Sequence, residues 1–87
     1  MYNLVLSQKF QKQIKQVVRS NPQIKPRLAK TFELLRKKIN YPSLRLHKLS
    51  GQNNWSVSVT RNIRIILHIE EDNIYLLRIG THDEVYY

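Results

Sequence analysis

The chain has 87 residues and a formal net charge of +9, because 15 lysines and arginines outnumber 6 aspartates and glutamates. We expect residues 1–87 to form a single domain, near the lower size limit for one apolar core. The absence of cysteine excludes a disulfide framework and thiolate metal sites. No apolar run reaches the roughly 20 residues of a membrane span, and no signal-peptide pattern begins the chain, so we expect a soluble intracellular protein without membrane contact.

The positive charge is unevenly distributed along the chain. Residues 1–64 contain fourteen of the basic residues and one acidic residue, Glu33, whereas residues 65–87 contain one basic residue, Arg78, and five acidic ones. A positive electrostatic field attracts and steers polyanions, whereas a surface whose charges serve only solubility usually has both positive and negative side chains. The charge therefore favours a polyanionic partner, which could be RNA, DNA, a ribosome or an acidic protein.

The first forty residues predict a strand and two helices. Residues 2–6 alternate in polarity and form a short strand, and Ser7 suits the N-cap of the helix that follows. Asn21 and Pro22 end this helix, and a second one follows, with Pro26 either in its first turn or at its start. The apolar positions at helical spacing are Phe10, Ile14, Val17 and Val18 in the first helix, and Leu28, Phe32, Leu35 and Ile39 in the second.

The rest of the chain predicts a β-meander. Strands are expected over residues 44–49, 55–60, 63–69 and 74–79, separated by turns over residues 50–54, 61–62 and 70–73. The predicted order is β-α-α-β-β-β-β. This order indicates an α+β fold in which a helical hairpin packs on one face of a mostly antiparallel sheet.

Strand alternation separates the two faces of this sheet. Trp55, Val57 and Val59 should point toward the helices, together with the odd-numbered residues of the strand 63–69. The opposite face should contain Ser56, Ser58, Thr60, Arg64, Ile66 and His68, and helices on one side only would leave it open. An arginine on an open sheet face is well placed to bind a phosphate.

The side-chain chemistry excludes several kinds of site. His47, His68 and His82 lie on separate segments without metal-ligand spacing. The sequence has neither the strained elbow of a nucleophilic serine nor a glycine-rich phosphate loop. We therefore expect no metal and no cofactor.

A set of phosphate-directed groups remains, namely Arg45, His47, Lys48, Arg61, Arg64, His82 and Tyr86. Cleavage of RNA at its own 2′-hydroxyl needs a base, an acid for the leaving oxygen, and cations for the charged phosphorane. Histidine suits either proton role near neutral pH, and the fork of arginine matches phosphate oxygens. Each residue also has an ordinary structural explanation: a histidine at a strand end, an arginine at a turn, or a frayed C-terminus at Tyr86 and Tyr87.

Three stretches together resemble the RelE/ParE toxin superfamily of bacterial type II toxin–antitoxin systems. They are residues 46–51 (LHKLSG), 55–66 (WSVSVTRNIRII) and 79–86 (IGTHDEVY). The first and last are closest to the YafQ-like branch, and the Trp-Ser opening of the second is similar to the YoeB-like branch. The resemblance covers nearly the whole chain.

The resemblance implies roles for individual residues. His82 matches the C-terminal catalytic histidine and would act as general acid, and Tyr86 matches the aromatic residue that stacks on or orients a base. His47 would act as a base or an orienting group, and Arg64 would contact the scissile phosphate. Arg61 and Lys48 would help to hold phosphate. The YafQ-like pattern has a histidine and an aspartate where this chain has Ser58 and Asn62, and the YoeB-like glutamate base has no clear counterpart.

The resemblance implies two alternative activities. The first is a ribosome-dependent mRNA endoribonuclease that inhibits translation, with ribosome and mRNA as partners. The second is a binding module without nuclease activity, either a ParE-like inhibitor of DNA gyrase or an inactive relative. Both alternatives imply an acidic antitoxin, a toxin–antitoxin hetero-oligomer and a place in the bacterial cytoplasm.

Overall fold

The computed structural model describes residues 1–51 and 53–86, so Gln52 of the expected turn 50–54 and Tyr87 at the expected C-terminus lie outside it. Five strands form one sheet in the order β1-β5-β4-β3-β2. Their bounds are β1 Asn3–Leu6, β2 His47–Lys48, β3 Trp55–Ser58, β4 Ile63–Glu70 and β5 Asn73–Thr81. β1 is parallel to β5, and the other neighbours are antiparallel, as the α+β prediction requires.

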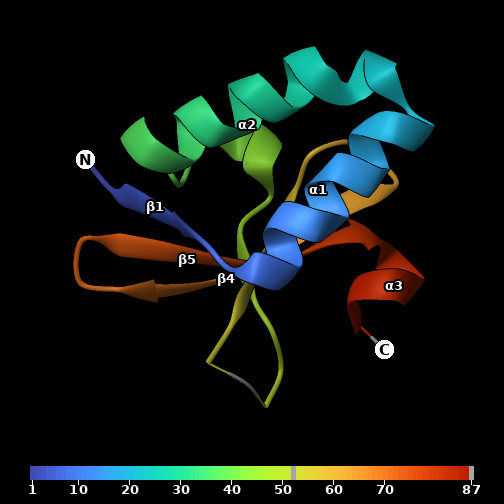
Figure 1. Ribbon diagram of the computed structural model, residues 1–87. Helices are drawn as coiled ribbons and strands as arrows, with labels where there is room; N and C mark the ends of the chain where they lie inside the picture. The colour runs from blue at the N-terminus through green and yellow to red at the C-terminus, as the bar shows by residue number, and fades with distance from the viewer. Residues whose placement is uncertain (52, 87) are drawn as a thin grey trace.

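Two helices cover one face of the sheet (Figure 1). α1 (Gln8–Ser20) is followed by the 3₁₀ turn η1 (Pro22–Ile24) and by α2 (Lys25–Lys37). The predicted N-cap is confirmed, because the Ser7 hydroxyl accepts a hydrogen bond of 3.0 Å from the Phe10 N–H. Phe10 of α1 and Phe32 of α2 meet edge to face with ring centroids 6.3 Å apart, which joins the two helices above the sheet.

The main core lies between these helices and the predicted face of the sheet. Phe10, Val57, Ile65 and Leu67 have no exposed surface, and Trp55, Ile63 and Ile69 are partly buried against them. The strand alternation therefore identified the helix-covered face correctly. None of the helices in the described part of the chain has the length and apolar character that crossing a bilayer requires.

Two predicted strands are shorter than expected. The strand predicted over 44–49 is reduced to His47–Lys48, because Pro42 begins a 3₁₀ turn (η2, Pro42–Leu44) and Arg45 adopts a left-handed conformation with φ of 49°. The strand predicted over 55–60 ends at Ser58. The N–H groups of Val59 and Thr60 both bond to the Ile63 carbonyl, which closes a tight turn.

The C-terminal segment is a helix, α3 (His82–Tyr86), where the sequence analysis predicted no helix. It packs on the face of the sheet that was expected to be open. Ser56, Ile66 and Val85 consequently have no exposed surface. The prediction of an open face was therefore wrong for its central part, which α3 covers.

Candidate functional site

The register of the sheet places several predicted site residues on one face. Arg64 on β4 lies opposite Ser58 on β3 and Gly80 on β5, and Ser56 lies opposite His47 on β2. Residues directly opposite each other in an antiparallel pair project to the same side of the sheet. Arg64 and His47 therefore project to the face on which α3 packs.

Arg64 is half-buried and anchored at one end of its guanidinium group. Its Nη1 donates a hydrogen bond of 3.2 Å to the Ser58 hydroxyl. A guanidinium has five N–H donors in a planar fork, so one bond to Ser58 leaves other donors for a ligand. Ser58 thus orients the arginine without neutralising its charge.

Two adjoining hollows contain most of the predicted phosphate ligands. One, of about 390 Å³, is lined by Arg61, Asn62, Arg64, Thr81, His82 and Asp83. The other, of about 300 Å³, is lined by Arg27, Ser43, Arg45, Ser58, Val59, Thr60, Arg61 and Arg64. Arg61 and Arg64 line both hollows. The structure therefore brings an imidazole to the same surface as a run of arginines.

α3 orients the imidazole of His82. The rings of His82 and Tyr86 are one helical turn apart and have centroids 4.4 Å apart at an angle of 56°. The Tyr86 hydroxyl donates a hydrogen bond of 2.8 Å to the buried Ser56 hydroxyl, which ties the end of α3 to β3. The His82 side chain is still 66% exposed, and its Nδ1 lies 3.6 Å from a carboxylate oxygen of Asp83. His82 is thus both supported and accessible to a ligand.

His47 lies at the edge strand β2 and does not line either arginine hollow. Its Nδ1 is 3.2 Å from the Arg45 carbonyl oxygen. In the tautomer with a proton on Nδ1, this contact is a hydrogen bond that leaves Nε2 as a proton acceptor. Its cross-strand neighbour Ser56 also bonds to Tyr86, so His47 belongs to the same face as α3.

Lys48 is separated from the other predicted phosphate ligands. It lies opposite Trp55, and strand alternation points it away from the face that contains Arg64. It lines a different hollow, of about 530 Å³, together with Leu49, Ser50, Gly51 and Asn53. The structure does not bring Lys48 together with His82.

Sequence analysis missed two basic residues of this surface. Arg78 lies opposite Ile66 and so projects to the same face as Arg64, and within residues 1–51 and 53–86 its Nε is a buried atom without a hydrogen-bond partner. Arg27 comes from α2, donates to the Val59 carbonyl at 3.3 Å and lines the second hollow. The signal for Arg78 was its isolation, because it is the one basic residue of the acidic C-terminal segment.

Potential metal ligands do not cluster on this surface. In the described residues, no group of three or more histidine, cysteine, aspartate or glutamate side chains is arranged to hold a metal ion. The third histidine, His68, lies on β4 with its Nε2 3.4 Å from a carboxylate oxygen of Glu70. Its Nδ1 lies 3.4 Å from the Asn53 carbonyl oxygen, and its ring lies beside Tyr75 of β5.

Comparison with known proteins agrees with the fold. Residues 2–87 match the model of the YafQ toxin family, described as a bacterial toxin of type II toxin–antitoxin systems. Among curated protein sequences, no match to the chain was found.

Several solved structures have the same fold. A copper-bound mutant toxin from Helicobacter pylori is 24% identical, with a TM-score of 0.81 over 98% of this chain and 99% of that one. YafQ in the E. coli DinJ–YafQ toxin–antitoxin complex is 18% identical, with a TM-score of 0.83 over 99% and 98%. A chain of the YoeB–YefM complex from Staphylococcus aureus is 12% identical, with a TM-score of 0.75 over 94% and 98%.

The family match spans all but the first residue and includes every predicted site residue from Arg45 to Tyr86. The structural matches extend over nearly the full length of both chains, so the family model and the fold agree. The chain therefore belongs to the YafQ family of type II toxin–antitoxin toxins.

Proposed function

We propose that this toxin is a metal-independent endoribonuclease that cuts mRNA bound to the ribosome and so inhibits translation. The observation that supports the proposal best is the hollow that His82 shares with Arg61 and Arg64. A proton donor beside two guanidinium groups suits a phosphodiester whose leaving oxygen must be protonated while its phosphorus gains negative charge.

The proposed reaction is an internal transesterification, in which the phosphorus is transferred from the 5′-oxygen of the next nucleotide to the 2′-oxygen. The 2′-hydroxyl oxygen attacks the adjacent phosphorus, and the bond from phosphorus to the 5′-oxygen of the next nucleotide breaks. The attacking hydroxyl gives its proton to a base, for which we propose Nε2 of His47, and protonated His82 gives a proton to the leaving 5′-oxygen. The products are a 2′,3′-cyclic phosphate and a free 5′-hydroxyl.

The arginines would stabilise the phosphorane and hold the message. Arg64, oriented by Ser58, would contact the scissile phosphate, and Arg61 lies within reach of the same hollow. Arg45 lines the adjoining hollow and would bind a neighbouring phosphate. Arg78 would add positive charge beneath α3. Lys48 would contact RNA outside this centre.

Tyr86 would act through its ring. Its hydroxyl is engaged with Ser56, so proton transfer is assigned to the histidines, and its ring packs on His82. An aromatic ring at this position can stack on an unpaired base of the message. Such stacking would orient the nucleotide relative to His82.

The ribosome would supply the remaining orientation of the substrate. Ser58 and Asn62 occupy the positions at which the related pattern has a histidine and an aspartate, so this site has fewer groups for proton transfer. Holding the reacting atoms in line contributes a large share of catalysis, and a message in the decoding site is already held. We therefore expect much faster cleavage on the ribosome than of free RNA.

An acidic antitoxin is the proposed partner. The E. coli and Staphylococcus relatives were solved in DinJ–YafQ and YoeB–YefM complexes, and the net charge of +9 favours an acidic protein that covers the arginine surface. Such a complex would form in the bacterial cytoplasm, where the ribosomes are.

The test is to add the purified toxin to ribosomes with a defined mRNA in the decoding site and to map the new ends. We expect cuts in the A-site codon with 5′-hydroxyl ends, and no cut when the 2′-hydroxyl at that position is replaced by hydrogen. Cleavage of the 2′-deoxy message would exclude the proposed chemistry. An intact message on competent ribosomes would favour the alternative, a gyrase-directed or inactive binding module.

A further inference from the structure

α3 is too short to be stable by itself. It has five residues, whereas isolated helices below about 12 residues are marginal in water. Its position must therefore depend on its caps and on packing. His82 and Tyr86, which are both proposed to act in RNA cleavage, belong to this helix.

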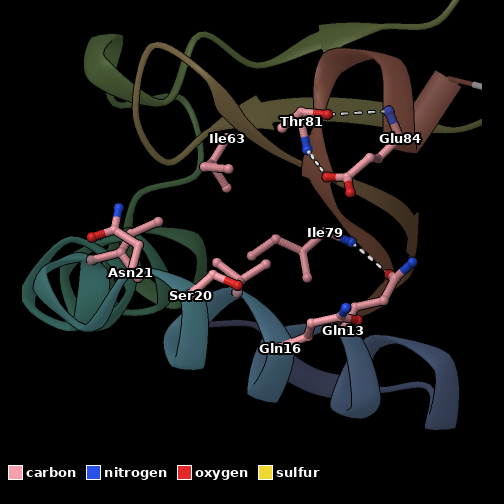
Figure 2. A pocket seen from close by; sticks show the side chains of 10 residues that line it. Gln13, Gln16, Ser20, Asn21, Ile63, Ile79, Thr81 and Glu84 are labelled. Atoms are coloured by element: carbon pink, nitrogen blue, oxygen red, sulfur yellow. Dashed lines mark hydrogen bonds between the residues drawn. The ribbon is translucent and has the colours of Figure 1, made fainter.

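The N-terminus of α3 contains a capping box. Thr81 precedes the helix, and Glu84 is its third residue. The Thr81 N–H donates to Oε1 of Glu84 at 2.8 Å, and the Glu84 N–H donates to the Thr81 hydroxyl at 3.3 Å. Figure 2 shows both bonds closing the turn between β5 and α3. This reciprocal pair satisfies two backbone donors that would otherwise lack partners at a helix start.

Glu84 also completes the unpaired edge of β5. β1 ends at Leu6 and pairs only with β5 residues up to Leu76, so among residues 1–51 and 53–86 no strand pairs with the later residues of β5 on that side. Side chains replace the missing strand there. The Ser7 hydroxyl donates to the Leu77 carbonyl, and Gln13 accepts from the Ile79 N–H at 2.9 Å. Figure 2 shows the bond between Gln13 and Ile79. Glu84 continues this series at Thr81.

Gly80 makes room for the Glu84 side chain. A Cβ atom at position 80 would lie 2.9 Å from Oε1 and 3.1 Å from Cβ of Glu84. A side chain at position 80 would therefore force the Glu84 carboxylate to move away. The glycine therefore allows the carboxylate to reach back over the strand to the Thr81 N–H.

We propose that Thr81 and Glu84 are positioning residues of the RNA-cleavage site. Their reciprocal hydrogen bonds fix the direction of α3 at its start, and the bond from Tyr86 to Ser56 fixes its end. Together they hold the His82 ring against Tyr86 and above Arg61 and Arg64. The inference rests on the proposed function for its effect on cleavage, but the effect on ring geometry is independent of it.

The experiment compares two disruptive variants, Glu84→Ala and Thr81→Val, with two conservative ones, Glu84→Gln and Thr81→Ser. Glu33→Ala is the matched control, because it removes one exposed carboxylate from α2. The first readout is the NMR chemical shift of the His82 ring protons, which the Tyr86 ring moves at a centroid distance of 4.4 Å. The second is the turnover number and KM for cleavage on the ribosome.

We expect both disruptive variants to lose the ring-dependent shift and to lower kcat by about tenfold. Loss of a helix cap shifts the equilibrium between ordered and frayed α3 by about this factor, and only the ordered helix holds His82 in place. KM should stay within about twofold, because Arg61 and Arg64 on β4 and its turn are unchanged. Glu84→Gln, Thr81→Ser and Glu33→Ala should keep the wild-type shift and rate. Retention of the His82 shift in both disruptive variants would overturn the proposal.

The two proposals fail in different ways. If wild-type toxin cuts no message, the proposed nuclease function is wrong, and the His82 shift alone then decides the role of the capping box. If the wild type cuts and the disruptive variants lose the shift but keep kcat, α3 is positioned by the box and the positioning has no catalytic role, which contradicts the proposal.

Discussion

At the scale of single residues, buried hydroxyl groups determine how the site is held. Ser56 has no exposed surface, and its hydroxyl is the acceptor for the Tyr86 hydroxyl. We expect Tyr86→Phe to destabilise the fold by about 1–2 kcal/mol, because it leaves a buried hydroxyl without this partner. Urea unfolding would measure the loss. In a double-mutant cycle with Ser56→Ala, a coupling energy near zero would contradict this interpretation.

Replacing Arg45 should have opposite effects on the stability of the fold and on RNA binding. A non-glycine residue at φ of 49° costs about 1 kcal/mol, and the Arg45 side chain is exposed at the rim of the second hollow. We expect Arg45→Gly to raise thermal stability slightly or leave it unchanged while it weakens RNA binding. Calorimetry and an RNA-binding titration would test the two effects. Unchanged RNA affinity would remove Arg45 from the site.

At the scale of elements, one serine ties the start of α1 to β5. The Ser7 hydroxyl accepts from the Phe10 N–H and donates to the Leu77 carbonyl at 3.2 Å. We expect Ser7→Ala to cost about 1–2 kcal/mol of unfolding free energy, because it removes both a helix cap and an edge bond. Exposed Ser43→Ala is the control, and equal urea midpoints for the two variants would refute the prediction.

The elements that sequence analysis predicted are those with a regular apolar period. α1 repeats its apolar residues over three turns, and β4 has an apolar residue at every second position from Ile63 to Ile69, so both were predicted nearly as the structure has them. α3 has little more than one turn and no such repeat. Its local signal was the Thr-x-x-Glu spacing of Thr81 and Glu84, which is typical of a capping box at the start of a helix. The prediction of helices did not include this short pattern.

The same limit explains what was missed in the site. Arg64 and His82 could be predicted as site residues, because their side-chain chemistry and their positions in the sequence are sufficient to identify them. The placement of Arg78 on the same face as Arg64 depends on the register of β4 and β5, which shifts between Ile66 and Leu67. The face of the sheet that Lys48 takes depends on the register of the two-residue strand β2 with β3. Neither feature has a reliable signal in a single sequence.

At the scale of the whole molecule, electrostatics should dominate binding of the message. The net charge is +9, and the two hollows contain Arg27, Arg45, Arg61 and Arg64. Each phosphate contact with a single strand contributes about 0.7 to the slope of log K against log salt concentration. We expect the double variant Arg61→Ala/Arg64→Ala to lower the magnitude of that slope by about 1.4. A titration of single-stranded RNA at several salt concentrations would show it.

A matched control exists for this comparison. Arg36 is an exposed arginine at the end of α2, where the N–H of Tyr2 bonds to its carbonyl oxygen, and it lines neither hollow. Arg36→Ala should leave the salt slope close to wild type. If Arg36→Ala reduced the slope as much per arginine as the double variant does, the positive charge would act diffusely and the arginine hollows would have no special role.

The most direct test of the central claim is the rate of A-site mRNA cleavage by His82→Ala on programmed ribosomes, with Arg36→Ala as control. Loss of a general acid removes about 10²–10⁴-fold in rate, so cleavage by His82→Ala should fall by at least about a hundredfold while Arg36→Ala cuts like the wild type. Cleavage by His82→Ala within a few-fold of the wild-type rate would show that another group protonates the leaving oxygen.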